Sequence, residues 1–92
     1  MSELSEIRAE INRIDDEIVS LFVRRLEAVG KIAEAKRASG KAVVDAEREK
    51  AVKDRVRALA GEKYGPYADL LFTALFDISK ARQRAILCEG RI

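Results

Sequence analysis

Apolar residues recur every three or four positions through the first 39 residues, the spacing expected for one face of an α-helix. The members of this stripe are Leu4, Ile7, Ile11, Ile14, Ile18, Leu21, Ala28, Ile32 and Ala35. Ser2 and Ser5 are candidate N-caps, and Gly40 is a candidate C-terminal stop. Gly30 falls inside the pattern, and we interpret it as a close-packing position. The pattern predicts one long helix from about Ser2 to Ser39.

The rest of the chain predicts two shorter helices. One begins at Asp45, a natural N-cap, and ends near Leu59, just before Gly61. A turn-like linker, GEKYGP, separates it from a helix that runs from about Tyr67 to Leu87. Their apolar faces are formed by Val52, Val56 and Leu59, and by Leu71, Leu75, Ile78, Phe72, Phe76 and Ile86. We therefore expect an all-α fold of three helices, one long and two shorter, in a single domain over residues 1–92.

The length of the first helix predicts a partner chain. About 36 residues, each rising about 1.5 Å, extend over roughly 54 Å. A compact domain of 92 residues has a radius of gyration of only about 12 Å. Such a helix would overhang a monomer and expose its apolar stripe to water. We expect a homodimer in which a second chain lies alongside this helix.

Composition and charge exclude several kinds of chemistry. The chain has no histidine and a single cysteine, Cys88, so histidine catalysis is excluded and a thiolate zinc site is not expected. We predict no metal. A formal net charge of +2 argues against nucleic acid as a partner. The chain contains no secretory signal and no apolar run of membrane-spanning length, and its lone thiol is typical of a reducing compartment, so we predict a cytoplasmic protein with no membrane partner.

Polar residues interrupt each apolar face. In the first helix, Arg25 occupies the heptad position of Ile18 and Ile32, and Lys36 follows eleven residues later on nearly the same face. Arg8 borders the same stripe. The second helix brings Arg48 and Glu49 to its packing face, and the third brings Ser79 and Gln83. The spacing of these residues from their apolar neighbours predicts that they lie on the packing faces.

Taken alone, each of these polar residues is more typical of a structural role. It could fix the register of the helix pairing, form a buried ion pair or donate a hydrogen bond to its own helix backbone. Burying so many charges on three helices without a ligand would cost several kcal/mol. A wet, anion-binding pocket is the simpler interpretation, and arginine suits it because its planar fork matches a carboxylate.

Three segments carry a family resemblance. They are I-x-x-I-D-x-x-I-x-x-L in the first helix, D-x-x-R-E at the start of the second, and S-x-x-x-Q near the end. From about Ile7 to Ile86 the chain resembles the all-helical chorismate mutases. The resemblance implies an intertwined homodimer with active sites shared between chains. It also implies rearrangement of chorismate to prephenate in phenylalanine and tyrosine biosynthesis, without cofactor or metal.

The resemblance also implies residue roles. Arg25, and Arg8 from the partner chain, would hold substrate carboxylates. Lys36 and Gln83 would donate to the ether oxygen, with Lys36 also near a carboxylate. Glu49 would accept from the ring hydroxyl. The other residues of the implied site are the backbone near Asp45, the polar wall of Arg48 and Ser79, and the apolar walls Val29, Ile32 and Phe76.

Two positions depart from the family pattern. Arg24 precedes Arg25 where relatives often have an acid, and we assign the site to Arg25 because it lies on the seam. Lys80 follows Ser79 where an apolar residue is common, and it is either exposed or adds charge near the pocket. Because the chain ends at Ile92, we expect no fused dehydrogenase or dehydratase domain.

Two other functions fit the same pattern. Isochorismate pyruvate lyase shares the fold and a similar pericyclic chemistry, although the intact D-x-x-R-E segment with Glu49 favours the mutase. A non-catalytic helical module that binds a partner protein is the other alternative. In that case Arg25, Lys36, Glu49 and Gln83 would only set the register of the dimer.

Overall fold

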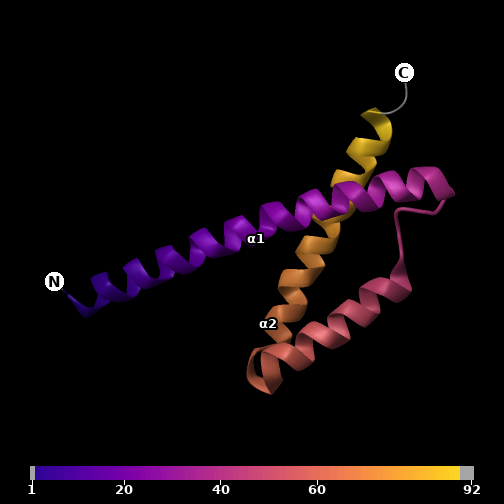
Figure 1. Cartoon of the computed structure of the whole chain (residues 1–92). Helices are drawn as coiled ribbons and strands as arrows, with labels where there is room; N and C mark the ends of the chain where they lie inside the picture. The colour runs from indigo at the N-terminus through magenta and orange to yellow at the C-terminus, as the bar shows by residue number, and fades with distance from the viewer. Residues whose placement is uncertain (1, 90–92) are drawn as a thin grey trace.

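The computed structural model describes residues 2–89, which form two helices, α1 (Glu3–Ser39) and α2 (Ala46–Glu89), and no strand (Figure 1). Ser2 caps α1, since its hydroxyl accepts from the Ser5 backbone N–H at 3.1 Å. Gly40 ends α1 with a φ of 72°, and its N–H donates to the Lys36 carbonyl at 2.8 Å. The predicted bounds of the long helix are confirmed, with Ser2 rather than Ser5 as its cap.

Asp45 begins α2 as predicted, because its side-chain carboxylate accepts from the Arg48 backbone N–H at 3.0 Å. The prediction of two separate helices beyond this point is wrong for the described residues. A single break at Gly61, with φ 86° and ψ 171°, divides α2 into two arms, 46–60 and 62–89. Only glycine adopts this backbone conformation readily, so one residue turns the chain and the expected GEKYGP loop is helical instead.

The two arms fold back on each other at this elbow. A Cβ built on Gly65 would lie 3.4 Å from the Arg57 carbonyl oxygen, so the backbones approach closely there. Asp69 on the second arm forms ion pairs with two residues of the first arm. Lys53 Nζ lies 3.3 Å from Asp69 Oδ1, and Arg57 Nη1 lies 3.0 Å from Asp69 Oδ2. The hydrogen bond from Lys53, followed by its charge and by Arg57, lowers the pKa of Asp69, although desolvation opposes this shift. These ion pairs hold the elbow closed.

The main buried cluster lies between the two arms of α2. Val52, Val56 and Phe76 form a buried cluster, with Ala68 and Phe72 packed against it. From α1, only Val29 and Ala33 are buried. The predictions for Val52, Val56, Phe76 and Ile86 are confirmed, whereas Leu59 (74% exposed), Leu71 and Ile78 are exposed in this chain. Among the described residues of a single chain, no element covers these three side chains.

Gly30 does not interrupt α1, as predicted. A Cβ on this residue would lie 3.5 Å from Ile86 Cδ1, which is an ordinary van der Waals contact. The glycine therefore sits where α1 meets the end of α2.

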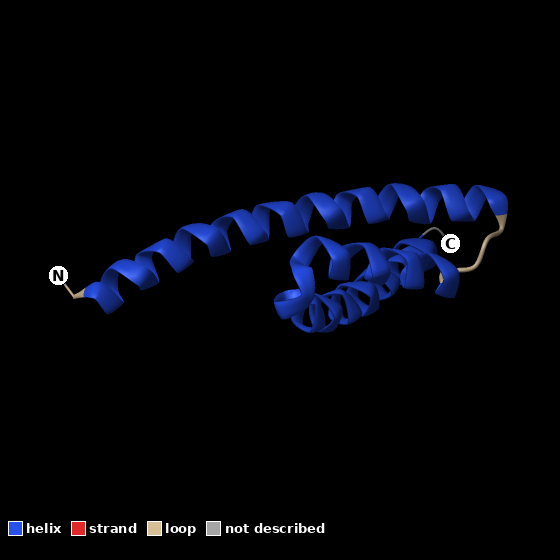
Figure 2. Ribbon diagram, turned by 90° about the horizontal axis from the view of Figure 1, so that it is seen from below, coloured by secondary structure: helices blue, strands red, loops and turns tan. Residues whose placement is uncertain are grey.

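The N-terminal half of α1 projects beyond the rest of the molecule (Figure 2). The chain measures 57 × 30 × 14 Å and has a radius of gyration of 16.8 Å, against about 12 Å for a compact domain of this length. Every residue of the predicted stripe in α1 is exposed. Neither helix of the described residues is long and apolar enough to cross a membrane.

Candidate active site

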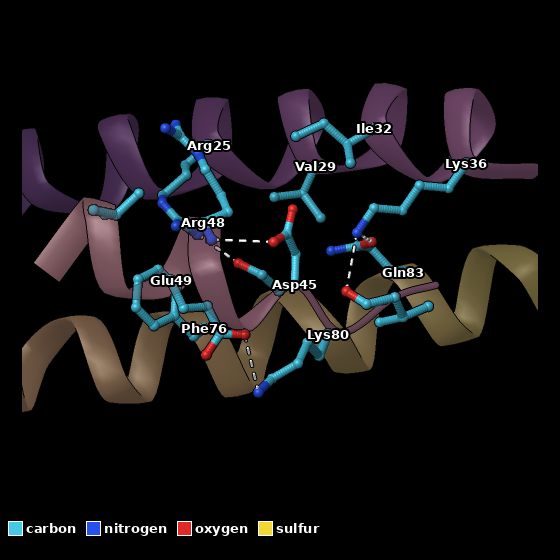
Figure 3. A pocket seen from close by; sticks show the side chains of 13 residues that line it. Arg25, Val29, Ile32, Lys36, Asp45, Arg48, Glu49, Phe76, Lys80 and Gln83 are labelled. Carbon is cyan, nitrogen blue, oxygen red and sulfur yellow. Dashed lines mark hydrogen bonds and ion pairs between the residues drawn. The ribbon is translucent and has the colours of Figure 1, made fainter. Parts of the chain in front are cut away.

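A cavity of about 350 Å³ lies between the C-terminal half of α1, the loop after it and both arms of α2. It contains the predicted site residues Arg25, Lys36, Asp45, Arg48, Glu49, Ser79 and Gln83, and the predicted apolar walls Val29, Ile32 and Phe76. Figure 3 shows Lys36 and Gln83 meeting toward one end of this pocket and Arg25 lying toward the other. The fold thus brings together polar residues that lie up to 58 positions apart between Arg25 and Gln83 in the sequence.

Arg8 is the one predicted site residue outside the cavity. It lies on the projecting half of α1, seventeen residues before Arg25, or roughly 25 Å along the helix axis. An α-helix cannot bend back over that distance, so Arg8 cannot serve the cavity of its own chain.

Lys36 and Gln83 form the first polar cluster. Lys36 Nζ donates to Gln83 Oε1 at 3.0 Å and to the Val43 carbonyl at 2.9 Å. An ammonium has three N–H groups, so one remains for a ligand. Because lysine only donates, the Gln83 oxygen must face it, which leaves the Gln83 amide nitrogen as a donor. The contact between Lys36 and the Val43 carbonyl could not be predicted from the sequence, because contacts to the backbone of a loop depend on the fold.

Arg25 and Ser79 form the second cluster. Arg25 Nη1 donates to Ser79 Oγ, and Ser79 Oγ donates to the Leu75 carbonyl at 2.7 Å. The guanidinium also lies 5.9 Å from the centre of the Phe72 ring. Partial burial lowers the pKa of Arg25 by desolvation. Ser79 therefore bonds back to its own helix and fixes an arginine at the same time, so the structural and the functional interpretations of this residue are compatible.

The neighbouring arginine is placed differently. Arg24 is exposed and does not line the cavity. Arg25, chosen over Arg24 from its seam position, does line the cavity, and its role in binding a ligand stays a prediction.

Glu49 is paired with Lys80, for which the sequence allowed either an exposed position or one near the pocket. Lys80 Nζ lies 3.3 Å from Glu49 Oε2, and both side chains line the cavity. Lys80 is therefore part of the pocket wall. Lys80 departs from the family pattern in the sequence, but its pairing with Glu49 on the other arm of α2 depends on the elbow at Gly61.

The cavity carries an excess of positive charge. Its lining contains four cationic side chains, Arg25, Lys36, Arg48 and Lys80, but only two carboxylates, Asp45 and Glu49. Asp45 is engaged as the α2 cap and Glu49 as the partner of Lys80. Residues 2–89 contain no cluster of acidic and cysteine side chains suited to a metal ion. The excess of positive charge suits a small anionic ligand.

Comparisons with known proteins identify the family. The model of the family described as chorismate mutase type II matches residues 7–84. A chorismate mutase of Methanocaldococcus jannaschii is 34% identical over 91 residues, which cover 97% of this chain and 92% of that protein. The T-protein of Haemophilus influenzae is 38% identical over 71 residues, covering 77% of this chain but 19% of that protein.

A bifunctional chorismate mutase/prephenate dehydratase of Buchnera aphidicola is 39% identical over 83 residues, 87% of this chain and 21% of that protein. The chain thus spans about a fifth of the length of the two larger relatives. No solved structure matches the chain. On the family match and on the full-length similarity to the M. jannaschii protein, this chain belongs to the type II chorismate mutase family.

Proposed function

We propose that the protein is a chorismate mutase, which rearranges chorismate to prephenate in the biosynthesis of phenylalanine and tyrosine. In this pericyclic step the ether C–O bond breaks while a C–C bond forms, and no group leaves the molecule. The enolpyruvyl side chain must fold over the ring, and negative charge gathers on the ether oxygen in the transition state. An enzyme can therefore act by holding the compact conformer and by aiming donors at that oxygen.

The observation that carries this proposal is the convergence of Lys36 and Gln83 in a cationic cavity. Both line the cavity, and each keeps at least one N–H group that these hydrogen bonds do not use. Both would donate to the ether oxygen and would gain strength as charge develops there. The Val43 carbonyl also holds the ammonium, by accepting a second hydrogen bond from it.

Carboxylate binding falls to the arginines. Ser79 holds Arg25 by one N–H group, so the other N–H groups of the fork are left for a carboxylate. Arg48 stands at the start of α2, where its backbone is tied to Asp45 and its side chain is exposed at the pocket. Glu49 would accept a hydrogen bond from the ring hydroxyl.

The active form in this proposal is a homodimer. Its support is the projecting half of α1, whose predicted stripe has six exposed large apolar residues, Leu4, Ile7, Ile11, Ile14, Ile18 and Leu21. A continuous apolar stripe of this length is not stable facing water. A second copy would cover it, and the stripe would lie across the partner's cavity region. Arg8 would then enter the partner's site and hold a second carboxylate.

We also place the protein in the cytoplasm. The support is Cys88, which is exposed and has no second cysteine to pair with. An exposed free thiol is typical of proteins in a reducing compartment.

The direct test is purified protein with chorismate, followed by loss of substrate and formation of prephenate. Rapid conversion to prephenate supports the proposal. No conversion by a protein shown to be a folded dimer would contradict it. Isochorismate is the second substrate to assay, since pyruvate release would identify the lyase instead.

A further inference from the structure

Lys80 is a polar member of the cavity wall to which the proposed reaction assigns no role. It lies on the second arm of α2, one residue after the Ser79 that fixes Arg25. Its side chain is 21% exposed, and its Nζ lies 3.3 Å from Glu49 Oε2 and 3.8 Å from Asp77 Oδ1. Asp77 is 73% exposed, whereas Glu49 is 28% exposed, so the shorter and more sheltered contact is the one that faces the pocket.

The contact engages only one of the two Glu49 oxygens. With Oε2 held by Lys80, the other oxygen remains as an acceptor for a ligand in the cavity. In Figure 3 a dashed line joins the Lys80 nitrogen to one oxygen of the Glu49 carboxylate. A carboxylate tied at one oxygen has fewer orientations, so less conformational freedom is lost when its other oxygen accepts a hydrogen bond.

The contact between Lys80 and Glu49 also reduces the repulsion between the Glu49 carboxylate and a negatively charged substrate. A substrate with two carboxylates must enter a cavity that contains the Glu49 carboxylate. An unpaired anion there would repel the substrate, and the effect is larger in a partly desolvated pocket than in water. An ammonium at 3.3 Å offsets this repulsion and leaves the Glu49 acceptor in place.

We propose that Lys80 is a positioning residue that acts through Glu49 and makes the site selective for a substrate with a ring hydroxyl. This inference rests on the proposed mutase activity. It predicts a specific defect when Lys80 is replaced: the enzyme loses the ability to distinguish the hydroxyl-bearing substrate from the same molecule without the hydroxyl.

The test compares kcat/KM for chorismate and for its analogue in which the ring hydroxyl is replaced by hydrogen. The variants are K80M, K80R and the control K50M. Lys50 lies on the first arm of α2 and forms an exposed pair with Asp54 at 3.3 Å, away from the cavity. A circular-dichroism melt of each variant reports folding separately from activity.

We expect K80M to lower the preference for chorismate over the analogue by about 3- to 10-fold, the usual range for a lost hydrogen-bonding partner. K80R should restore most of the preference, and K50M should match the wild type. In an E49Q background K80M should change the preference no further, because both residues act on one contact.

Each outcome decides between the alternatives. If K80M is folded and keeps the wild-type preference, or if K80M and E49Q act additively, Lys80 is only a surface ion-pair partner and the inference is wrong. If K80M does not fold, K80Q supports the same comparison. If the wild type converts neither compound, the proposed function fails and the inference fails with it, a result distinct from an active enzyme whose preference does not change.

Discussion

At the scale of single residues, the cavity is organised by polar side chains that orient one another before any ligand arrives. Ser79 fixes Arg25, and Val43 and Gln83 fix Lys36. No buried side-chain nitrogen or oxygen among the described residues lacks a partner. Groups that are already in place lose little entropy on binding, which favours both affinity and rate.

Replacing Lys36 by alanine tests the donor to the ether oxygen. We expect kcat to fall by about 10²- to 10³-fold, the usual loss when one donor to a developing oxyanion is removed. Lys31, an exposed lysine of α1 outside the cavity, provides the control, and K31A should keep wild-type kcat. A K36A enzyme with normal kcat would show that Lys36 has only a structural role.

Replacing Ser79 by alanine tests the positioning of Arg25. The arginine loses its anchor, and we expect kcat/KM to fall by about 3- to 10-fold, the range for one hydrogen bond. Thr73 offers a matched control, because its hydroxyl also donates to the carbonyl four residues earlier, that of Asp69 at 3.0 Å, but meets no arginine. Equal effects of S79A and T73A on kcat/KM would argue against the role of Ser79.

Most cavity residues were predictable from sequence because they break an apolar face at helical spacing. Arg25, Glu49 and Gln83 were found in this way. Lys80 was not assigned, because a charged residue beside a seam looks the same whether it faces solvent or a pocket. The Val43 carbonyl was not predictable, since every backbone has one.

At the scale of elements, the elbow of α2 decides how the site is assembled. Gly61 turns the chain and Asp69 ties the two arms, so the start of the first arm comes to lie beside Ser79 and Gln83 of the second. The composition predicted helix on both sides of the elbow. The missing loop could not be predicted, because Gly and Pro in GEKYGP are equally typical of a longer turn.

Replacing Gly61 by alanine should destabilise the protein by about 1–3 kcal/mol, the cost of forcing a Cβ into this backbone conformation. Gly30 is the contrasting case, because it lies in a regular helix and a Cβ there meets Ile86 at ordinary contact distance. G30A should therefore leave stability unchanged or raise it by up to about 1 kcal/mol. Urea unfolding of both variants would show the contrast, and equal stability of G61A and wild type would contradict it.

The ion pairs of Asp69 predict a pH dependence of stability. Lys53 and Arg57 lower the pKa of Asp69 in the folded state below its unfolded value of about 3.9. The pairs therefore stabilise the fold at pH values above about 4, and this contribution is lost as pH falls through the lowered pKa.

We expect D69N to be less stable than wild type at neutral pH and the difference to shrink below about pH 4. The exposed Lys50–Asp54 pair provides the control, and D54N should show a smaller effect at neutral pH because exposed pairs contribute little. Melting temperatures across pH measure this. A constant difference between D69N and wild type at every pH would contradict the assignment.

At the scale of the whole molecule, we propose that one chain does not form a complete site. The length of α1 predicted an overhang, and the 57 Å extent of the chain confirms it. The overhang carries the apolar stripe and Arg8, while the cavity lies at the other end of the same helix. We therefore expect each site to take Arg8 from a second copy.

Mixing two inactive variants tests this requirement most directly. R8A and K36A homodimers should each be nearly inactive on chorismate, since every site lacks one group. After unfolding and refolding together, half of the dimers would be mixed, and each mixed dimer would contain one complete site. The account predicts recovery of about a quarter of wild-type activity, as two-fold symmetry requires. A refolded mixture that contains mixed dimers but stays inactive would contradict it.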